Sequence, residues 1–473
     1  MKSNSPNFTQ IALGMVGSTK FGRYPKISVE QTFNMIESDG FLVDYAGYKA
    51  VSVISEGANQ GRGLFNSTRF NHMIVVIDNG VYIVDAAIAV IKIAAIETFA
   101  GDVFIDENDA NQIAICDKRN LYIFNYVANT FQQISLDFIP NYISFQDGYF
   151  IAAVQGSPNW RLSALNDGTS WPAAPNNIGS FQTKPDNCVA VVRVPGRGGN
   201  VLVFGDTVAE AWVDAGLPIF PYQRNNSFNI DYGTLNPATI AFGDKFAIWL
   251  GSNEKSGPVI MYSTGGDPKT IENDGINFKL SSLNNPGNSY GFIFKQDGHL
   301  FYQLTFPDPD DNFSITFDFN KQAFYTVCDP NQNYFIAKRV VFFNDGYYFV
   351  SFNDGKLYKL GTEFTDYDGE LIPRMRVCPT LRLPGTRPFI ANNLSFIVEQ
   401  GNADTDYRID VSISRDGGVN FGNPAGYPLN AIGNRSNIFQ IWNLGYANEF
   451  TPQFRFWSSD RFVVGEGEVS IYQ

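Results

Sequence analysis

Short runs of β-branched and aromatic residues, separated by turn residues, recur along most of the chain, whereas helical periodicity is scarce. The first clear unit, residues 72–85, has two apolar runs on either side of an Asp-Asn-Gly turn. Such a turn needs positive φ angles, which Asn and Gly tolerate, so the unit is expected to be a β-hairpin. Residues 112–125 repeat the same layout.

Seven such units align on the first residue of a strand-like run, and the anchors are Met73, Ile113, Tyr149, Val201, Phe246, Leu300 and Tyr347. The mean step between anchors is about 46 residues, within the roughly 40–50 residues of a four-stranded propeller blade. One unit cannot bury both faces of its sheet, whereas a ring of units can, and closure removes long exposed edges. The pattern therefore predicts an all-β fold with a seven-bladed β-propeller over residues 49–373. The alternative is a pair of β-sandwiches with irregular hairpins.

Closure of such a ring needs one strand that joins the first blade to the last. We expect this strand within residues 49–54 or among the strands near Leu357, and residues 1–48 before it are interpreted as an N-terminal arm.

The pattern of charges changes near residue 373, because the last 100 residues contain nine arginines, nine acidic residues and no lysine. Strand-like runs continue there, so residues 374–473 are predicted to form a separate, small antiparallel β-sandwich.

The whole net charge of −13 therefore lies in residues 1–373, which argues against broad nucleic-acid binding, since that requires a cationic surface. The longest apolar run, residues 86–96, is too short to cross a bilayer and contains Lys92, so no membrane insertion is expected. No secretory signal is apparent. We therefore expect the protein to fold in a cytosol, with its four scattered cysteines reduced.

Catalytic chemistry has little support in the sequence. The only histidines, His72 and His299, lie far apart, and zinc-type Cys-x-x-Cys spacing is absent, so neither a metal or other cofactor nor a Ser-His-Asp triad is expected. Residues 307–312, Pro-Asp-Pro-Asp-Asp-Asn, suggest either calcium ligands or a solvated turn, and the turn is favoured. The glycine-rich residues 196–199 are interpreted as a hairpin tip and not a phosphate loop.

The sharpest short motif is Ser414-Arg-Asp416-Gly-Gly418-Val-Asn-Phe421, which fits the Asp-box pattern of sialidase propellers. A sialidase-like propeller glycosidase is therefore a competing hypothesis. Mechanically, however, the box is a hairpin device in which Asp caps the turn, Gly permits positive φ, and the aromatic residue packs beneath. We interpret it as a fold element and predict that the protein is not an enzyme.

Several segments, weak individually, occur in an order known from one family. They are Phe33-Asn-Met35, Gly40-Phe-Leu42, Gly47 and Asn66 near the start; Asp167-Gly-Thr-Ser-Trp171, Lys184-Pro-Asp186, Val203-Phe-Gly205 and Glu210-Ala-Trp212 in the middle; and Val411 to Gly417, Asn420-Phe-Gly422, Trp442-Asn-Leu-Gly445 and Phe454-Arg-Phe456 at the end. In order and total length, the chain resembles the packaged-DNA stabilisation (tail-hub) proteins of short-tailed phages. The acidic propeller half departs from that family.

The resemblance implies a structural virion protein of the phage tail, assembled in the host cytoplasm as a homo-hexamer beneath the portal-adaptor ring. Such a hub retains packaged DNA, lets it pass through the channel without sequence-specific binding, and carries tail needle or tailspike proteins. The tubular tail nozzle proteins of other short-tailed phages are a related alternative, and a generic protein-binding propeller is another.

The arginines of the C-terminal segment are the candidate contacts with neighbouring subunits or the adaptor ring, because arginine is enriched at interfaces where lysine is depleted. The residues to test are Arg374, Arg382, Arg387, Arg408, Arg435, Arg455 and Arg461.

Overall fold

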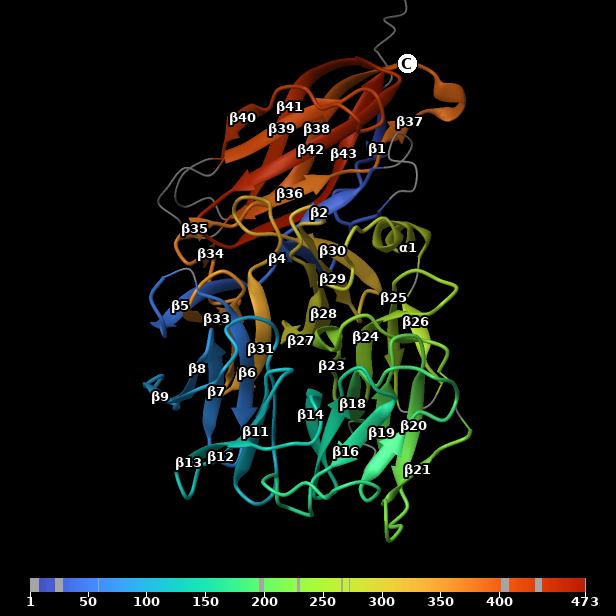
Figure 1. Cartoon of the computed structure of the whole chain (residues 1–473). Coiled ribbons are helices and arrows are strands. Elements are labelled where there is room, and N and C mark those ends of the chain that lie inside the picture. Colours follow the sequence, from blue (N-terminus) through green and yellow to red (C-terminus); the bar gives the residue numbers. More distant parts are fainter. Residues whose placement is uncertain are drawn as a thin grey trace, which may run out of the picture.

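The computed structural model describes residues 8–21, 29–57, 59–194, 200–227, 230–264, 267–271, 273–400, 408–429 and 436–472. These residues form two units, a ring of small β-sheets and a β-sandwich seated against one side of the ring (Figure 1). The fold is all-β, as predicted. The one α-helix among these described residues, α1 (Asp274–Ser281), lies between the fifth and sixth sheets of the ring.

Seven sheets make up the ring, counted over the described residues. Blade 1 holds β6 (Gly61–Ser67), β7 (His72–Ile77), β8 (Gly80–Val84) and β9 (Val90–Ala95). Blade 2 holds β10 (Phe104–Glu107), β11 (Gln112–Cys116), β12 (Leu121–Asn125) and β13 (Thr130–Ile134). Blade 3 holds β14 (Pro140–Gln146), β15 (Tyr149–Val154), β16 (Asn159–Leu162) and β17 (Ile178–Ser180).

Blade 4 holds β18 (Ala190–Arg193), β19 (Asn200–Phe204), β20 (Ala209–Asp214) and β21 (Tyr222–Arg224). Blade 5 holds β22 (Gly233–Thr234), β23 (Ala241–Phe242), β24 (Ala247–Ser252), β25 (Val259–Ser263) and β26 (Lys269–Ile271). Blade 6 holds β27 (Tyr290–Gln296), β28 (His299–Phe306), β29 (Phe313–Asp318) and β30 (Ala323–Val327). Blade 7 holds β31 (Ala337–Phe343), β32 (Gly346–Ser351), β33 (Lys356–Gly361) and β5 (Gly47–Val53).

The sequence anchors mark the same strand in every blade. Six of the seven lie in the second strand, and the seventh, Phe246, directly precedes β24. The second strands are recognisable because they are buried and apolar and often follow an Asp-Gly turn. At two of these turns Asp147 and Gly148, then Asp297 and Gly298, have positive φ angles of 51° and 83°, then 48° and 83°. Glycine and aspartate tolerate this conformation, which matches the twist of a tight hairpin.

The predicted closing strand is confirmed. β5, from the N-terminal part of the chain, pairs antiparallel with β33, so that Tyr48 lies opposite Leu360. Within the described part of the chain, no sheet closes on itself. Instead, a hydrophobic cluster fills each space between neighbouring blades, and the cluster between blades 7 and 1 joins Phe343, Tyr348 and Leu357 to Met73 and Val75. The ring is therefore held by face-to-face packing of open sheets, with one strand of blade 7 supplied from far away in the sequence.

The sandwich has two sheets around a separate core. Its first sheet contains β1 (Thr9–Ala12), β3 (Met35–Ser38), β4 (Phe41–Asp44), β43 (Phe462–Tyr472), β38 (Phe389–Gln400) and β41 (Ser436–Ala447). Its second sheet contains β2 (Gln31–Phe33), β36 (Arg374–Val377), β42 (Glu449–Trp457), β39 (Arg408–Ser414), β40 (Ala425–Pro428) and the short β37 (Leu381–Arg382). Two further short strands extend the sheet of blade 7: β34 (Asp366–Tyr367) pairs with β5, and β35 (Glu370–Leu371) pairs with β34.

Strands β1 to β4 come from the segment interpreted as an N-terminal arm. In the structure they are members of the sandwich sheets: β1 and β4 pair with β43, and β2 pairs with β36. β2 also lies parallel to β30, so the sheet of blade 6 continues into the second sheet of the sandwich. The chain therefore enters the sandwich first, then builds the ring, and returns to complete the sandwich.

All four cysteines are buried and unpaired. Burial raises the pKa of Cys116, Cys328 and Cys378 to about 12, and that of Cys188 well above its usual value. Because the thiolate is the reactive form, we expect an aromatic disulfide reagent to label no cysteine of the folded protein and four after unfolding in urea. Rapid labelling of any cysteine without denaturant would contradict this prediction.

Candidate functional site

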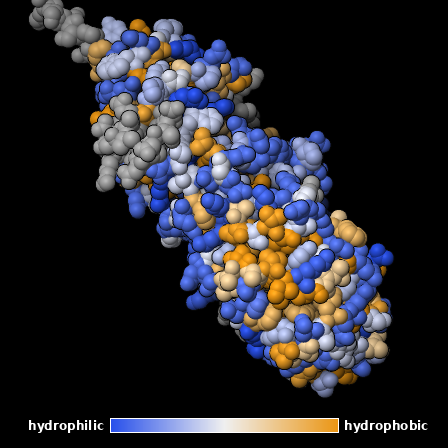
Figure 2. All heavy atoms as spheres, turned by 90° about the vertical axis from the view of Figure 1, so that its left-hand side faces the viewer, coloured by the Kyte–Doolittle hydropathy of each residue, from blue (hydrophilic) through white to orange (hydrophobic). Residues whose placement is uncertain are grey.

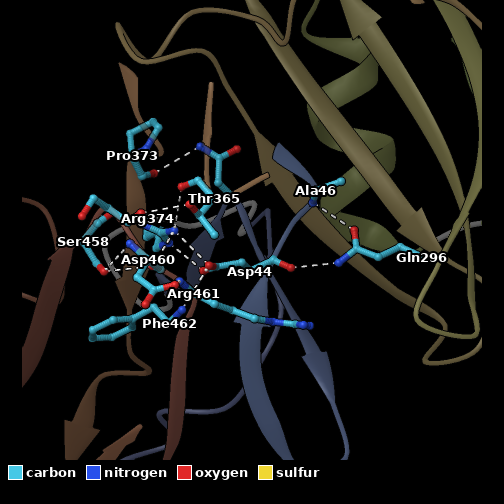
Figure 3. Close-up of polar contacts among 12 residues, drawn as sticks. Asp44, Ala46, Gln296, Thr365, Pro373, Arg374, Ser458, Asp460, Arg461 and Phe462 are labelled. Carbon is cyan, nitrogen blue, oxygen red and sulfur yellow. Dashed lines mark hydrogen bonds and ion pairs between the residues drawn. The ribbon is translucent and has the colours of Figure 1, made fainter. Parts of the chain in front are cut away.

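A buried ion pair next to blade 6 joins the two sheets of the sandwich, shown in Figure 3. Asp44 ends β4, and Arg374 begins β36. The guanidinium donates from Nε to Asp44 Oδ1 at 2.6 Å and from Nη2 to Oδ2 at 2.9 Å. Arg374 is only 1% exposed, and its Nη1 donates to the carbonyl oxygen of Ser458 at 2.9 Å. The bidentate geometry and the extra acceptor leave this buried cation well satisfied.

Asp44 also contacts the ring through its backbone. Its carbonyl oxygen accepts from Gln296 Nε2 at 2.8 Å, and Gln296 Oε1 accepts from the amide of Ala46 at 2.9 Å (Figure 3). Gln296 ends β27 of blade 6. The carboxylate of Asp44 meanwhile accepts from the amide of Phe462, the first residue of β43. One aspartate therefore connects blade 6 to both sheets of the sandwich.

A second buried arginine lies two residues further along β36. Arg376 donates to Glu30 Oε1 at 2.7 Å, to Thr32 Oγ1 at 3.0 Å and to the carbonyl oxygens of Met15 and Gly14 at 2.9 and 2.7 Å. All these acceptors come from the N-terminal segment, which Arg376 thereby fastens to the sandwich. Because Nε, Nη1 and Nη2 of Arg376 each donate to an acceptor inside the chain, the role of this side chain is structural.

The predicted interface arginines fall into several environments. Arg374 is enclosed within the chain, so it presents no surface to a partner. Arg461 is exposed and pairs with Asp297 of the β27–β28 turn at 3.0 Å, which links the sandwich to blade 6. Arg382 is half-buried and pairs with Glu449 at 2.7 Å within the sandwich. Arg435 lies outside the described residues.

The other three remain at least partly accessible. Arg387 is exposed just before β38. Arg408 is exposed, pairs with Asp410 at 2.9 Å, and lies with its guanidinium carbon 5.7 Å from the ring centre of Trp457. Arg455 is half-buried and lines a small pocket with Trp457 and Phe33. The structure thus gathers Arg408 and Arg455 around Trp457, but it spreads the other described arginines of the set over several faces. Sequence reasoning missed Arg376, Glu30, Asp44 and Gln296. The residues next to a buried charge in the sequence do not indicate which distant residue will pair with it.

The Asp box forms a turn after β39, in the sandwich and not in the ring. Asp416 Oδ1 accepts from Ser414 Oγ at 2.6 Å and from the amides of Val419 and Asn420. Gly417 and Gly418 have φ angles of 78° and 92°. Every part of the motif except the half-buried Phe421 is thus explained by the turn itself, as predicted.

These hydrogen bonds stabilise the charged form of Asp416 and lower its pKa to about 2. Because the pKa is lower in the folded than in the unfolded state, the contribution of the turn is present above pH 4 and is lost as the pH falls toward 2. We expect an NMR titration of the Asp416 carboxyl carbon to give a midpoint near 2. In Asn420→Ala, which lacks the 2.7 Å amide bond to Asp416 Oδ2, the midpoint should move up toward the usual value. Equal midpoints in both proteins would contradict this assignment.

The acidic turn at residues 307–312 also has internal partners. Asp311 accepts from the amides of Asn284 and Asn285, and Asp308 accepts from the Asn285 side chain at 3.1 Å. Across the described ranges there is no group of three or more His, Cys, Asp or Glu residues that could hold a metal ion.

Residues 196–199 lie outside the described part of the chain. Of the histidines, His299 is buried against Asp318 at 2.7 Å. Among the described helices, none is long and apolar enough to cross a membrane.

The mid-chain segments that carry the family resemblance have clear structural roles. Asp167 caps its own turn by accepting from the Thr169 amide at 2.9 Å. Asp186 accepts from the amides of Thr207 and Val208, which fixes the β19–β20 turn. The buried Glu210 accepts from the amides of Gln182 and Thr183 and from Trp212 Nε1. These residues hold the hairpins and connecting loops of blades 3 and 4.

Comparison with known proteins identifies the family. A family model for phage stabilisation, described as Bacteriophage P22 Gp10, beta-propeller, matches residues 21–360, which include all seven blades. The chain belongs to this family. The family is one of structural phage proteins concerned with the stabilisation of packaged DNA, and a structural role in the virion is the assignment that follows.

Other comparisons are distant. No curated protein matches the chain. Among solved structures, virginiamycin B lyase from Staphylococcus aureus is similar with a TM-score of 0.46 and 10% identity, over 67% of this chain and 99% of that one. The N-terminal domain of Nup159 is similar with a TM-score of 0.41 and 9% identity, over 70% of this chain and 98% of that one. The phage-stabilisation family alone therefore carries the functional assignment.

Proposed function

We propose that this protein is a tail hub and head-completion factor, present as six copies in a ring beneath the portal-adaptor ring of a short-tailed phage. The ring retains packaged DNA and carries tail needle or tailspike proteins. DNA passes through the channel of the assembly without sequence-specific binding. The subunits are made in the host cytoplasm and end in the tail of the virion.

The observation that carries the proposal is the family match over residues 21–360, which spans the whole propeller. The structure adds support, because the propeller and sandwich are not loosely tethered. A continuous sheet, the hydrogen bonds of Gln296 with the backbone of Asp44 and Ala46, and the exposed pair Arg461–Asp297 connect them. A hub that withstands the pressure of packaged DNA benefits from such a stiff joint between its two units.

The distribution of charge also supports the proposal. Residues 1–373 hold 25 basic and 38 acidic residues, whereas the last 100 hold nine of each. An acidic surface repels the phosphate backbone, so DNA is not retained by nonspecific binding as it passes. The exposed Arg387 and Arg408 remain the candidates for contact with the adaptor ring or distal tail proteins, because their guanidinium groups reach the surface.

The proposal is tested by removing the gene from the phage. We expect heads that fill but lose their DNA, and normal particles when the gene is supplied in trans. Native mass spectrometry of tails released from normal virions should give six copies of the chain. Three or twelve copies would refute the stoichiometry, and tails that lack the chain would refute the function.

A further inference from the structure

The six-stranded sheet of the sandwich turns one side away from the sandwich core, and we call this side the sheet face. Its side chains alternate along each strand with those that fill the core. The large apolar side chains exposed on it include Phe41, Ile390, Ile397, Ile438, Trp442 and Tyr446. Contiguous apolar surface of this kind marks a protein interface.

β41 is an edge strand of this sheet. It pairs with β38, and no other described strand pairs with it. Ile438, Gln440 and Trp442 point outward from it, and the two isoleucine and tryptophan side chains are 66% and 58% exposed. Phe439 and Ile441, between them, are buried in the sandwich core. Such an edge is a template for a further strand, because its outer N–H and C=O groups have no partner in the sheet.

The C-terminal part of the same edge is already covered. The register of β41 on β38 shifts between Ala391 and Asn393. Beyond this shift, Arg415 donates to the carbonyl oxygens of Leu444 and Tyr446. Over residues 438–442, before the shift, no described residue donates or accepts a hydrogen bond at the outer edge. The open part of the edge is therefore residues 438–442.

β41 also lacks the residues that usually protect an edge strand from pairing. Its sequence, Ser436–Ala447, contains no charged residue and no proline. Figure 2 shows apolar side chains gathered on the propeller half as well, on the side where β9 lies in Figure 1. The outer strand β9, however, carries Lys92, whose Nζ lies 5.8 Å from the ring centre of Tyr82. Because lysine on an edge opposes the addition of a strand, β41 is the better template of the two.

The charges of the sheet indicate the chemistry of the partner. The strands β1, β3, β4, β38, β41 and β43 contain acidic residues but no lysine or arginine. Glu399 on β38 and Glu468 on β43 are exposed, and neither carboxylate has a partner among the described residues. Glu399 lies one strand in from the edge, so an added strand would run roughly 10 Å away, a distance that a lysine and a glutamate side chain span together. The partner therefore carries lysine or arginine beside its apolar residues.

We infer that an extended segment of another virion protein adds to residues 438–442 as a further β-strand. Main-chain hydrogen bonds to the open edge hold this strand, and its apolar side chains lie beside Ile438 and Trp442 while a lysine or arginine reaches Glu399. The inference rests on the proposed function, since it assigns the way in which the proposed hub holds one of its partners.

A second copy of this chain is not the occupant that we assign, for two reasons. Its net charge of −13 matches poorly with an acidic face. Pairing of β41 with β41 of another copy would also be an isologous contact about a two-fold axis, whereas a single ring of six copies is built from heterologous contacts.

Hydrogen exchange tests the strand pairing. Amides within residues 438–442 should exchange about tenfold or more slowly in tails released from virions than in the isolated chain, because alternate amides gain hydrogen bonds. Ile438→Lys places a charge on the open edge and should abolish this protection. The matched control is Val127→Lys, at an apolar residue that is 71% exposed in a turn of blade 2, and it should keep the protection. Both isolated variants should keep the melting temperature of the parent chain, because the replaced side chains are exposed.

Photocrosslinking identifies the occupant. A photoreactive phenylalanine analogue in place of Trp442 should form, in tails, a product with one other virion protein, within a segment that carries lysine or arginine. Glu399→Lys should lower the yield of this product about tenfold, because like charges would then oppose each other. Replacement of the basic residue of that segment by glutamate should restore the yield. Glu56→Lys, the same change of charge at an exposed glutamate before blade 1, should leave the yield unchanged.

Some outcomes would overturn the inference. They are equal exchange of residues 438–442 in tails and in the isolated chain, a crosslink from position 442 to a copy of this chain, or a loss of yield in Glu56→Lys as large as in Glu399→Lys. If tails contain six copies but the edge stays unprotected, the assigned contact is wrong and the hub function stands. If tails contain no copies, the hub function itself fails.

Discussion

Arg374→Ala is expected to destabilise the protein by about 3–5 kcal/mol, because it leaves the carboxylate of Asp44 buried without its counter-charge. The effect should appear as a lower urea midpoint, followed by tryptophan fluorescence. The loss is not confined to one contact, since the same guanidinium also supports the carbonyl oxygen of Ser458. We expect the blade 6–sandwich junction to show the largest increase in hydrogen exchange.

Arg461→Ala is the matched control for this variant. It removes an arginine–aspartate pair from the same junction, but Arg461 is largely solvated, so the cost should be about 0–1 kcal/mol. The double variant Asp44→Leu/Arg374→Met replaces both buried charges with apolar groups and should cost less than Arg374→Ala alone. A loss from Arg374→Ala no larger than that from Arg461→Ala would show that the buried pair does not hold the two sheets of the sandwich together.

The second large effect is expected at the strand that closes the ring. Tyr48 on β5 is buried, stacks on Tyr367 with ring centres 4.6 Å apart, and meets Phe335, Phe349 and Tyr358 edge to face. Tyr48→Ala should cost about 3–5 kcal/mol, as for other large buried aromatic residues cut to alanine. Because β5 is covalently remote from the rest of blade 7, its release should also expose β33 and the contact between blades 7 and 1.

Tyr48→Phe serves as the control, since it keeps the ring and removes only the hydroxyl group. It should remain within about 1 kcal/mol of the parent protein. Hydrogen exchange measured by mass spectrometry distinguishes ring opening from local fraying. Faster exchange in Tyr48→Ala should extend to residues 337–361 and 61–77. Faster exchange confined to residues 47–53 would mean that β5 is an appendage and does not close the propeller.

The sequence alone was sufficient to predict the blade repeat and, from that repeat, the propeller. Alternating apolar runs, Asp-Gly turns and a step of about 46 residues predicted seven blades, and each anchor lies in or directly before the second strand of its blade. These features are local, because a hairpin and its turn occupy adjacent residues and need no knowledge of the rest of the chain. The Asp box was interpreted correctly as a turn for the same reason.

The charged residues show where local reasoning ends. A count of arginines could not separate the enclosed Arg374 from the exposed Arg408, because both are arginines at the start of a strand. Their difference depends on Asp44, which lies 330 positions from Arg374.

By itself, then, the sequence determined the all-β class, the blade repeat, the turn chemistry and the family resemblance. Only the tertiary structure decided that β1 to β4 join the sandwich, that blade 6 continues into it, and which charges are buried or exposed. The physical reason is the range of the interactions. Hairpins are stabilised between neighbouring residues, whereas sheet continuation and buried ion pairs join segments that meet only after the ring has closed.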